Sequence, residues 1–91
     1  MEMKQVRYFL ALYKERNFTR AAERCGVTQP SLTKAIKSLE SKLGGALFYR
    51  SQSETQLTEL GRLVYPRMRR IDKEAAYAQQ IAKTIKVRKS S

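Results

Sequence analysis

The segment from residue 28 to residue 43 carries amide, hydroxyl and cationic side chains on one side of an expected helix. At about 100° per residue, one arc of this helix holds Leu32, Ile36, Leu39 and Leu43. The opposite arc holds Pro30, Lys34, Lys37 and Ser41, with Gln29 at the helix start and Thr33 at the flank. Because this outward side carries no carboxylate, it differs from an ordinary solvated helix face, which is the alternative interpretation.

These outward groups have the chemistry needed to read the edges of base pairs. A glutamine amide can bond adenine N6 and N7, and a lysine can reach guanine O6 or N7. Pro30 and the Thr33 methyl group can contact a thymine methyl group. We therefore expect Gln29, Pro30, Thr33 and Lys34 to lie in one major groove of duplex DNA.

Catalytic and metal-binding chemistry has few candidates in this chain. Histidine is absent and cysteine occurs once, so one chain cannot assemble a zinc finger or a disulfide framework. The sequence offers no recognisable carboxylate pair for acid–base catalysis and no serine with a histidine for nucleophilic catalysis. It also offers no glycine-rich phosphate loop. We expect a binding protein that is no enzyme and has no cofactor.

The charge balance points to a polyanionic partner. The 91 residues include 19 Lys and Arg against 8 Asp and Glu, a net charge of +11. Nucleic acid is the first candidate partner and an acidic membrane the second. No apolar run approaches the roughly 18 residues that span a bilayer, and the first residues lack a signal-peptide core. The sequence predicts a cytoplasmic, nucleoid-associated protein.

Three short helices must position the outward side chains. Apolar residues at steps of three and four predict a helix over residues 3–16. Asn17 is a cap for a second helix that Gly26 ends, and Thr28 is a cap for a third helix that Gly44 ends. Two short helices joined by a glycine-containing turn form a helix-turn-helix, whose second helix enters the major groove.

The remaining residues predict a hairpin and a long helix. Residues 46–50 and 55–58 flank a polar turn and could form the two arms of a wing. From Thr58 to about Val87 the pattern is helical, and Pro66 removes one backbone hydrogen bond without excluding a helix. Its stripe is nearly a heptad seam and consists of Leu60, Val64, Met68, Ile71, Ala75, Ala78, Ala82 and Ile85. The stripe predicts a partner helix and hence a homodimer.

The stretch TRAAERCGVTQPSLTKAIKSLESKLGGALFYR resembles the N-terminal domain of LysR-type transcriptional regulators. The matching residues are Ala21, Ala22, Gln29, Pro30, Ile36, Leu39, Glu40, Leu43, Gly44, Leu47, Phe48, Arg50, Leu57, Thr58 and Gly61. The resemblance extends from residue 2 to about residue 88, in order through both helices, the wing and the linker helix. It implies a bacterial transcription factor that binds a pseudo-palindromic operator as a homodimer, with antiparallel linker helices.

The expected fold class is all-α with a minor two-stranded wing: a winged helix-turn-helix followed by a long dimerisation helix. We assign residues 1–57 to the DNA-binding head, 58–88 to the linker helix and 89–91 to the start of a further linker. The family's effector-binding domain of two α/β lobes is absent from this chain, so we expect no small-molecule effector site here. The resemblance is also compatible with a tetramer of the full-length protein.

The candidate contacts fall into two sets. The DNA-binding set is Thr28, Gln29, Pro30, Ser31, Thr33, Lys34, Lys37, Arg50 and Ser53. The dimerisation set is Leu60, Val64, Met68, Ile71, Ala75, Ala78, Ile81 and Ile85. Arg50 is expected at the DNA backbone, whereas Ser53 stands where the family frequently has a basic wing residue, so the wing should grip DNA less strongly.

Two other functions stay open. A sequence-neutral nucleoid or ribosomal protein would need only the +11 charge and a long basic helix. A membrane-surface helix over residues 58–89 would need large apolar side chains along its stripe, whereas the later stripe is mostly alanine. Cys25 lies on the apolar side of its helix, where a small buried hydrophobe is a commoner interpretation than a redox sensor.

Overall fold

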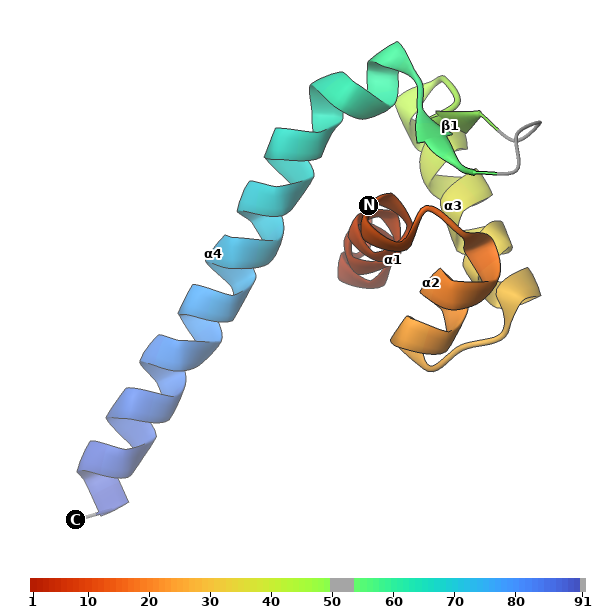
Figure 1. Ribbon diagram of the computed structural model, residues 1–91. Helices are drawn as coiled ribbons and strands as arrows, with labels where there is room; N and C mark the ends of the chain where they lie inside the picture. Colours follow the sequence, from red (N-terminus) through yellow and green to blue (C-terminus); the bar gives the residue numbers. More distant parts are fainter. Residues whose placement is uncertain (50–53, 91) are drawn as a thin grey trace.

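The chain forms a small helical head from which one long helix projects. A computed structural model describes residues 1–49 and 54–90, and the molecule measures 55 × 25 × 19 Å. The elements in order are α1 (Met3–Glu15), α2 (Phe18–Cys25), α3 (Gln29–Leu43), β1 (Phe48–Tyr49), β2 (Gln56–Leu57) and α4 (Glu59–Ser90). Figure 1 shows α1, α2 and α3 gathered around one centre, with the far end of α4 well away from them. The expected all-α class with a two-stranded wing is confirmed.

The predicted helix caps are present. The Asn17 side chain accepts a hydrogen bond of 2.8 Å from the Arg20 N–H, and Thr28 Oγ accepts one of 3.2 Å from the Ser31 N–H. Gly26 and Gly44 follow α2 and α3 with φ of 69° and 79°, a conformation that favours a residue without Cβ. α1 ends one residue earlier than expected, because Arg16 adopts φ of 54° and leaves the helix.

The core lies where α1, α2 and α3 meet. Each helix contributes fully buried side chains, among them Phe9 and Leu12 from α1 and Leu32, Ile36 and Leu39 from α3. Ala21 and Ala22 are buried on α2, where their small size lets the neighbouring helices approach. Leu47, Phe48 and Met68 extend this core toward the wing and α4, and the Phe9 and Phe48 rings lie 5.4 Å apart.

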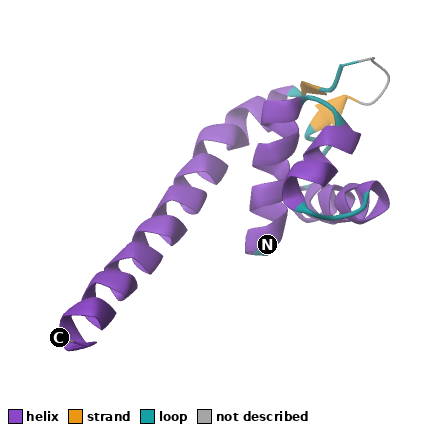
Figure 2. Cartoon of the chain, turned by 60° about the horizontal axis from the view of Figure 1, so that its bottom comes forward, coloured by secondary structure: helices purple, strands orange, loops and turns teal. Residues whose placement is uncertain are grey.

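The wing is joined to the head by backbone hydrogen bonds. β1 and β2 are antiparallel, with Phe48 opposite Leu57 and Tyr49 opposite Gln56. The Leu47 N–H donates to the Glu40 carboxylate at 2.7 Å, and the Thr55 N–H donates to the Arg16 carbonyl at 3.1 Å. The predicted contact residues Arg50 and Ser53 lie outside the described residues. In Figure 2 the two strands sit at the edge of the helical head.

α4 continues through Pro66 and ends at Ser90, three residues beyond the expected end near Val87. The Thr58 hydroxyl accepts a hydrogen bond of 3.1 Å from the Gly61 N–H, which confirms the predicted cap. Leu60, Val64, Met68 and Ile71 of the predicted stripe pack against the chain's own core, and Met68 is only 3% exposed. Periodic apolar spacing in the sequence does not show whether the chain's own core or a partner helix covers the apolar side. Only the later part of the stripe is left uncovered.

A prediction concerns Gly61, at the start of α4. A Cβ there would overlap the Leu47 carbonyl oxygen and lie 2.7 Å from Leu57 Cδ2. Gly61→Ala should therefore lower the free energy of unfolding by about 2 kcal/mol or more, because a backbone atom cannot move aside cheaply. Urea denaturation measures the change.

Gly45→Ala is the matched control. Its Cβ would meet only the flexible end of Leu60, at 3.0 Å, so the cost should be smaller. Equal unfolding free energies for the two variants would contradict this account of how α4 crosses the wing.

Candidate nucleic-acid interface

Helix α3 has one buried side and one exposed side. Leu32, Ile36 and Leu39 each have 0% exposure. The exposed residues on the other side include Gln29, Pro30, Ser31, Lys34, Lys37 and Ser41, and Thr33 is half-buried at the boundary. The predicted DNA-binding residues of α3 thus share one accessible surface, which we call the α3 outer face. It offers an amide, hydroxyls and two ammonium groups.

The start of α3 is held by its own cap. Thr28 Oγ accepts the Ser31 N–H, and the same hydroxyl donates to Ser31 Oγ at 2.9 Å. Thr28 therefore acts first as a cap, and it orients Ser31 at the same time. The side chains of Gln29, Lys34 and Lys37 make no hydrogen bond or ion pair with other described residues. These groups are available to an external partner.

The turn between α2 and α3 fixes how α3 is presented. Gly26 takes the left-handed conformation, and the Val27 N–H donates to the Ala22 carbonyl at 3.0 Å. The half-buried Val27 side chain packs against the core and anchors the turn. A rotation of α3 about its axis would therefore bury polar groups and expose Leu32 or Ile36. This is the helix-turn-helix geometry that the sequence predicted.

The electrostatics of the head favour an anion. An ion pair joins Arg24 to Glu15, with 2.9 Å between Nη1 and Oε2. Arg7 of α1, Arg16 directly after α1, and Arg20 of α2 are exposed. A surface with many cations and few paired carboxylates attracts the phosphate backbone of nucleic acid.

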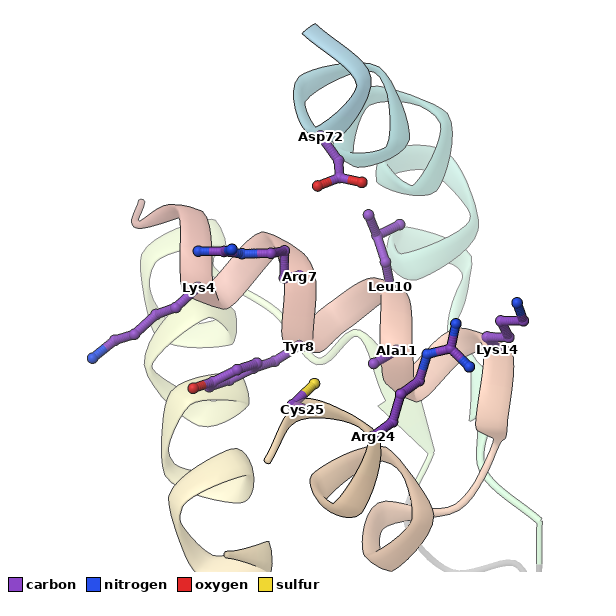
Figure 3. A pocket seen from close by; sticks show the side chains of 9 residues that line it. All are labelled: Lys4, Arg7, Tyr8, Leu10, Ala11, Lys14, Arg24, Cys25 and Asp72. Carbon is purple, nitrogen blue, oxygen red and sulfur yellow. The ribbon is translucent and has the colours of Figure 1, made fainter. Parts of the chain in front are cut away.

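A cavity of about 540 Å³ lies on another part of the head, between α1, α2 and α4. Figure 3 shows Cys25 facing α1 near Tyr8, and Asp72 of α4 above Leu10, while Lys4 and Lys14 extend away from one another. Burial raises the pKa of the Cys25 thiol, and the Arg24 and Arg7 charges partly offset that shift. A thiol with a raised pKa is poorly reactive, and Cys25 packs against the core as a small hydrophobe.

Other classes of site find no support in the described part of the chain. Residues 1–49 and 54–90 hold no group of three or more His, Cys, Asp or Glu placed to bind a metal ion. None of the described helices has the length and apolar character that a membrane crossing requires.

The large exposed apolar residues on the far part of α4 match the predicted dimerisation set only in part. Tyr77, Ile81 and Ile85 are 64%, 49% and 49% exposed, and their spacing of four places them on one side of the helix. Ala78 is also exposed, and Ala75 is half-buried. Tyr77 lies outside the predicted seam, because the heptad steps run through Ala75 and Ala78. The spacing of four from Tyr77 to Ile85 was the available signal.

Comparison with known proteins identifies the fold and the family that this geometry resembles. Residues 3–62 match the family described as bacterial regulatory helix-turn-helix protein, lysR family. The chain is 45% identical over 65 residues to the probable cat1 operon transcriptional activator of Acinetobacter lwoffii, covering 71% of this chain and 22% of that protein. It is 46% identical over 65 residues to the HTH-type transcriptional regulator BudR of Klebsiella aerogenes, covering 71% of this chain and 46% of BudR. The chain thus spans less than half the length of these relatives.

Solved structures are similar to this chain over nearly its whole length. The BenM DNA-binding domain in complex with catB site 1 DNA has a TM-score of 0.89 and 30% identity, covering 93% of this chain and 94% of that one. The CbnR DNA-binding domain in complex with DNA has a TM-score of 0.86 and 33% identity, covering 93% and 98%. Both matches include the winged helix-turn-helix and the long helix, so the fold predicted from the sequence is confirmed.

Proposed function

The chain belongs to the lysR family of bacterial regulatory helix-turn-helix proteins, and we propose that it is the sequence-specific DNA-binding head of a transcription regulator. The observation that carries this proposal is the α3 outer face, which is accessible, free of carboxylates and fixed in direction by the buried side of the same helix. The two similar domains solved with DNA support duplex DNA as the ligand.

Recognition would divide between base edges and phosphates. Gln29, Pro30, Thr33 and Lys34 lie in the first two turns of α3, the part of a recognition helix that meets base edges. Thr28 and Ser31 at the helix start, and Lys37 about two turns further along, would contact the backbone. We also propose Arg50 and Ser53 as DNA contacts, although both lie outside the described residues. Phosphate contacts would then supply affinity, and base contacts discrimination.

Association through α4 would arrange two heads on one operator. Ile81 and Ile85 are half exposed, and Tyr77 more so, and none of the three is among the described residues that pack against the core. Antiparallel pairing with a second α4 would bury these side chains and Ala78, and would set the distance between two α3 helices. Two heads related in this way would read a pseudo-palindrome. We propose that the regulator works as such a homodimer on the bacterial nucleoid in the cytoplasm, and is no enzyme.

The base-reading role can be tested at two positions. Gln29→Ala and Lys34→Ala should each weaken binding to a duplex selected by this chain from a randomised library, by about 1 to 3 kcal/mol. Binding to mixed-sequence DNA should change little, because only the matched bases are read. Fluorescence anisotropy titrations with both duplexes measure the difference.

Lys83→Ala removes one charge from the far part of α4 and is the control for Lys34→Ala. It should leave discrimination between the two duplexes unchanged. Equal losses on selected and mixed DNA for Gln29→Ala and Lys34→Ala would favour the sequence-neutral binder instead.

The dimer has its own test at Ile81. Ile81→Asp should convert the protein to monomers, because a charged group cannot be buried in an apolar seam without a partner. Ile71→Asp is less informative, since Ile71 packs on the protomer's own core. Sedimentation velocity reports the mass in solution.

Gln79→Asp places the same carboxylate on the opposite side of α4, about 200° around the helix from Ile81, and should leave the dimer intact. An unchanged sedimentation profile for Ile81→Asp would remove the proposed role of the exposed α4 stripe.

A further inference from the structure

A second cavity, of about 300 Å³, lies under the wing between the end of α1 and the start of α4. The lining residues are Tyr13, Arg16, Phe48, Thr55, Gln56, Leu57, Arg62 and Tyr65, so two arginines and four groups able to hydrogen-bond stand beside two apolar side chains. No carboxylate lines it, and no ion pair joins either arginine to a described carboxylate, including the sequence neighbours Glu54 and Glu59. The cavity is therefore a basic, hydrogen-bonding seat with no internal counter-ion.

Backbone hydrogen bonds fix the chain at both arginines. Arg16 ends α1 in the left-handed conformation, and its carbonyl accepts the Thr55 N–H at 3.1 Å. Its guanidinium lies 5.9 Å from the centre of the Tyr13 ring, and that ring stacks on Tyr65 at 4.1 Å. Arg62 follows directly from the cap of α4, with its N–H bonded to the Thr58 carbonyl at 2.9 Å. Preorganisation of this kind lowers the entropy cost of binding a ligand.

The seat lies beside the DNA-reading elements. The hydrogen bond from Thr55 to Arg16 places the second arm of the wing against the turn that leads into α2. In a helix-turn-helix the first helix crosses the DNA backbone while the second enters the groove. α2 begins two residues after Arg16, so a strand that leaves the groove on the wing side would pass this cavity.

We infer that Arg16 and Arg62 form a phosphate seat for the duplex backbone, outside the set of base-reading residues on α3. Guanidinium groups bind phosphate oxygens in a bidentate manner, and the Tyr13 face keeps one of them in place. The seat has no feature that distinguishes base pairs. It would therefore add affinity and fix the register of the head on any duplex. This inference rests on the proposed function, since it takes duplex DNA as the ligand.

The test is the salt dependence of binding. Each phosphate that a protein neutralises contributes about 0.9 to the slope of log K against log salt on duplex DNA. The double variant R16Q/R62Q keeps side-chain length and removes both charges. It should lower that slope by about one to two per protomer, with equal losses of affinity on selected and mixed duplexes. The double variant R16K/R62K retains both charges and should restore most of the slope.

The control removes two charges elsewhere on α1. K4Q/R7Q changes the other cavity, and Arg7 lies about 14 Å along the helix from Arg16. Its slope should stay close to that of the parent. A slope for R16Q/R62Q that equals that of the parent or of this control overturns the phosphate seat.

Fold loss and failure of the proposed function can both be recognised. Circular dichroism shows whether R16Q/R62Q keeps its helices. If this double variant unfolds, the single variant R62Q, at an exposed position, should still lower the slope of log K against log salt by about 0.9. A parent that discriminates between duplexes while R62Q leaves the slope unchanged overturns the seat alone. A lowered slope with no discrimination by the parent supports the seat and overturns the sequence-specific part of the proposed function. A parent that binds neither duplex overturns both.

Discussion

The burial of one side of α3 is the constraint on which the rest depends. Leu32, Ile36 and Leu39 are fully buried, and each contributes about 1.5 to 3 kcal/mol relative to exposure. A rotation that turned the polar side inward would lose this burial and leave lysine ammonium groups without water. The same packing that stabilises the head therefore fixes the direction in which Gln29 and Lys34 point. Stability and the proposed DNA recognition both follow from one helix orientation.

α4 packs against the head with its first turns and extends away from the head with its later turns. Its first four turns complete the core through Met68 and Ile71, and Gly61 lets it cross the wing closely. Beyond Ala75 the helix leaves the head, and Tyr77, Ile81 and Ile85 lie in solvent. A rod anchored in this way holds its far end at a defined angle to α3. Association through that end would consequently determine how two recognition helices are spaced.

Much of this architecture could be predicted because its signals are local. Asn17, Thr28, Gly26 and Gly44 mark helix ends through their own backbone chemistry, and the apolar steps of α3 identify its buried side. Arg16 was assigned to the helix because nothing in an arginine side chain announces a left-handed backbone. Periodicity likewise shows that Leu60 and Met68 share one apolar side of α4, but not that the chain's own head packs against them. The cavity under the wing joins residues from four separate segments, which no spacing in the sequence brings together.

DNA binding through the α3 outer face is the proposal on which the others depend. Its most direct test is a map of backbone amide chemical shifts, recorded as a selected duplex is added to the labelled chain. The account predicts the largest changes over residues 28–37, with smaller changes at the wing and at the start of α2. Changes confined to the basic segment of α4 over residues 67–73, with α3 unaffected, would contradict it.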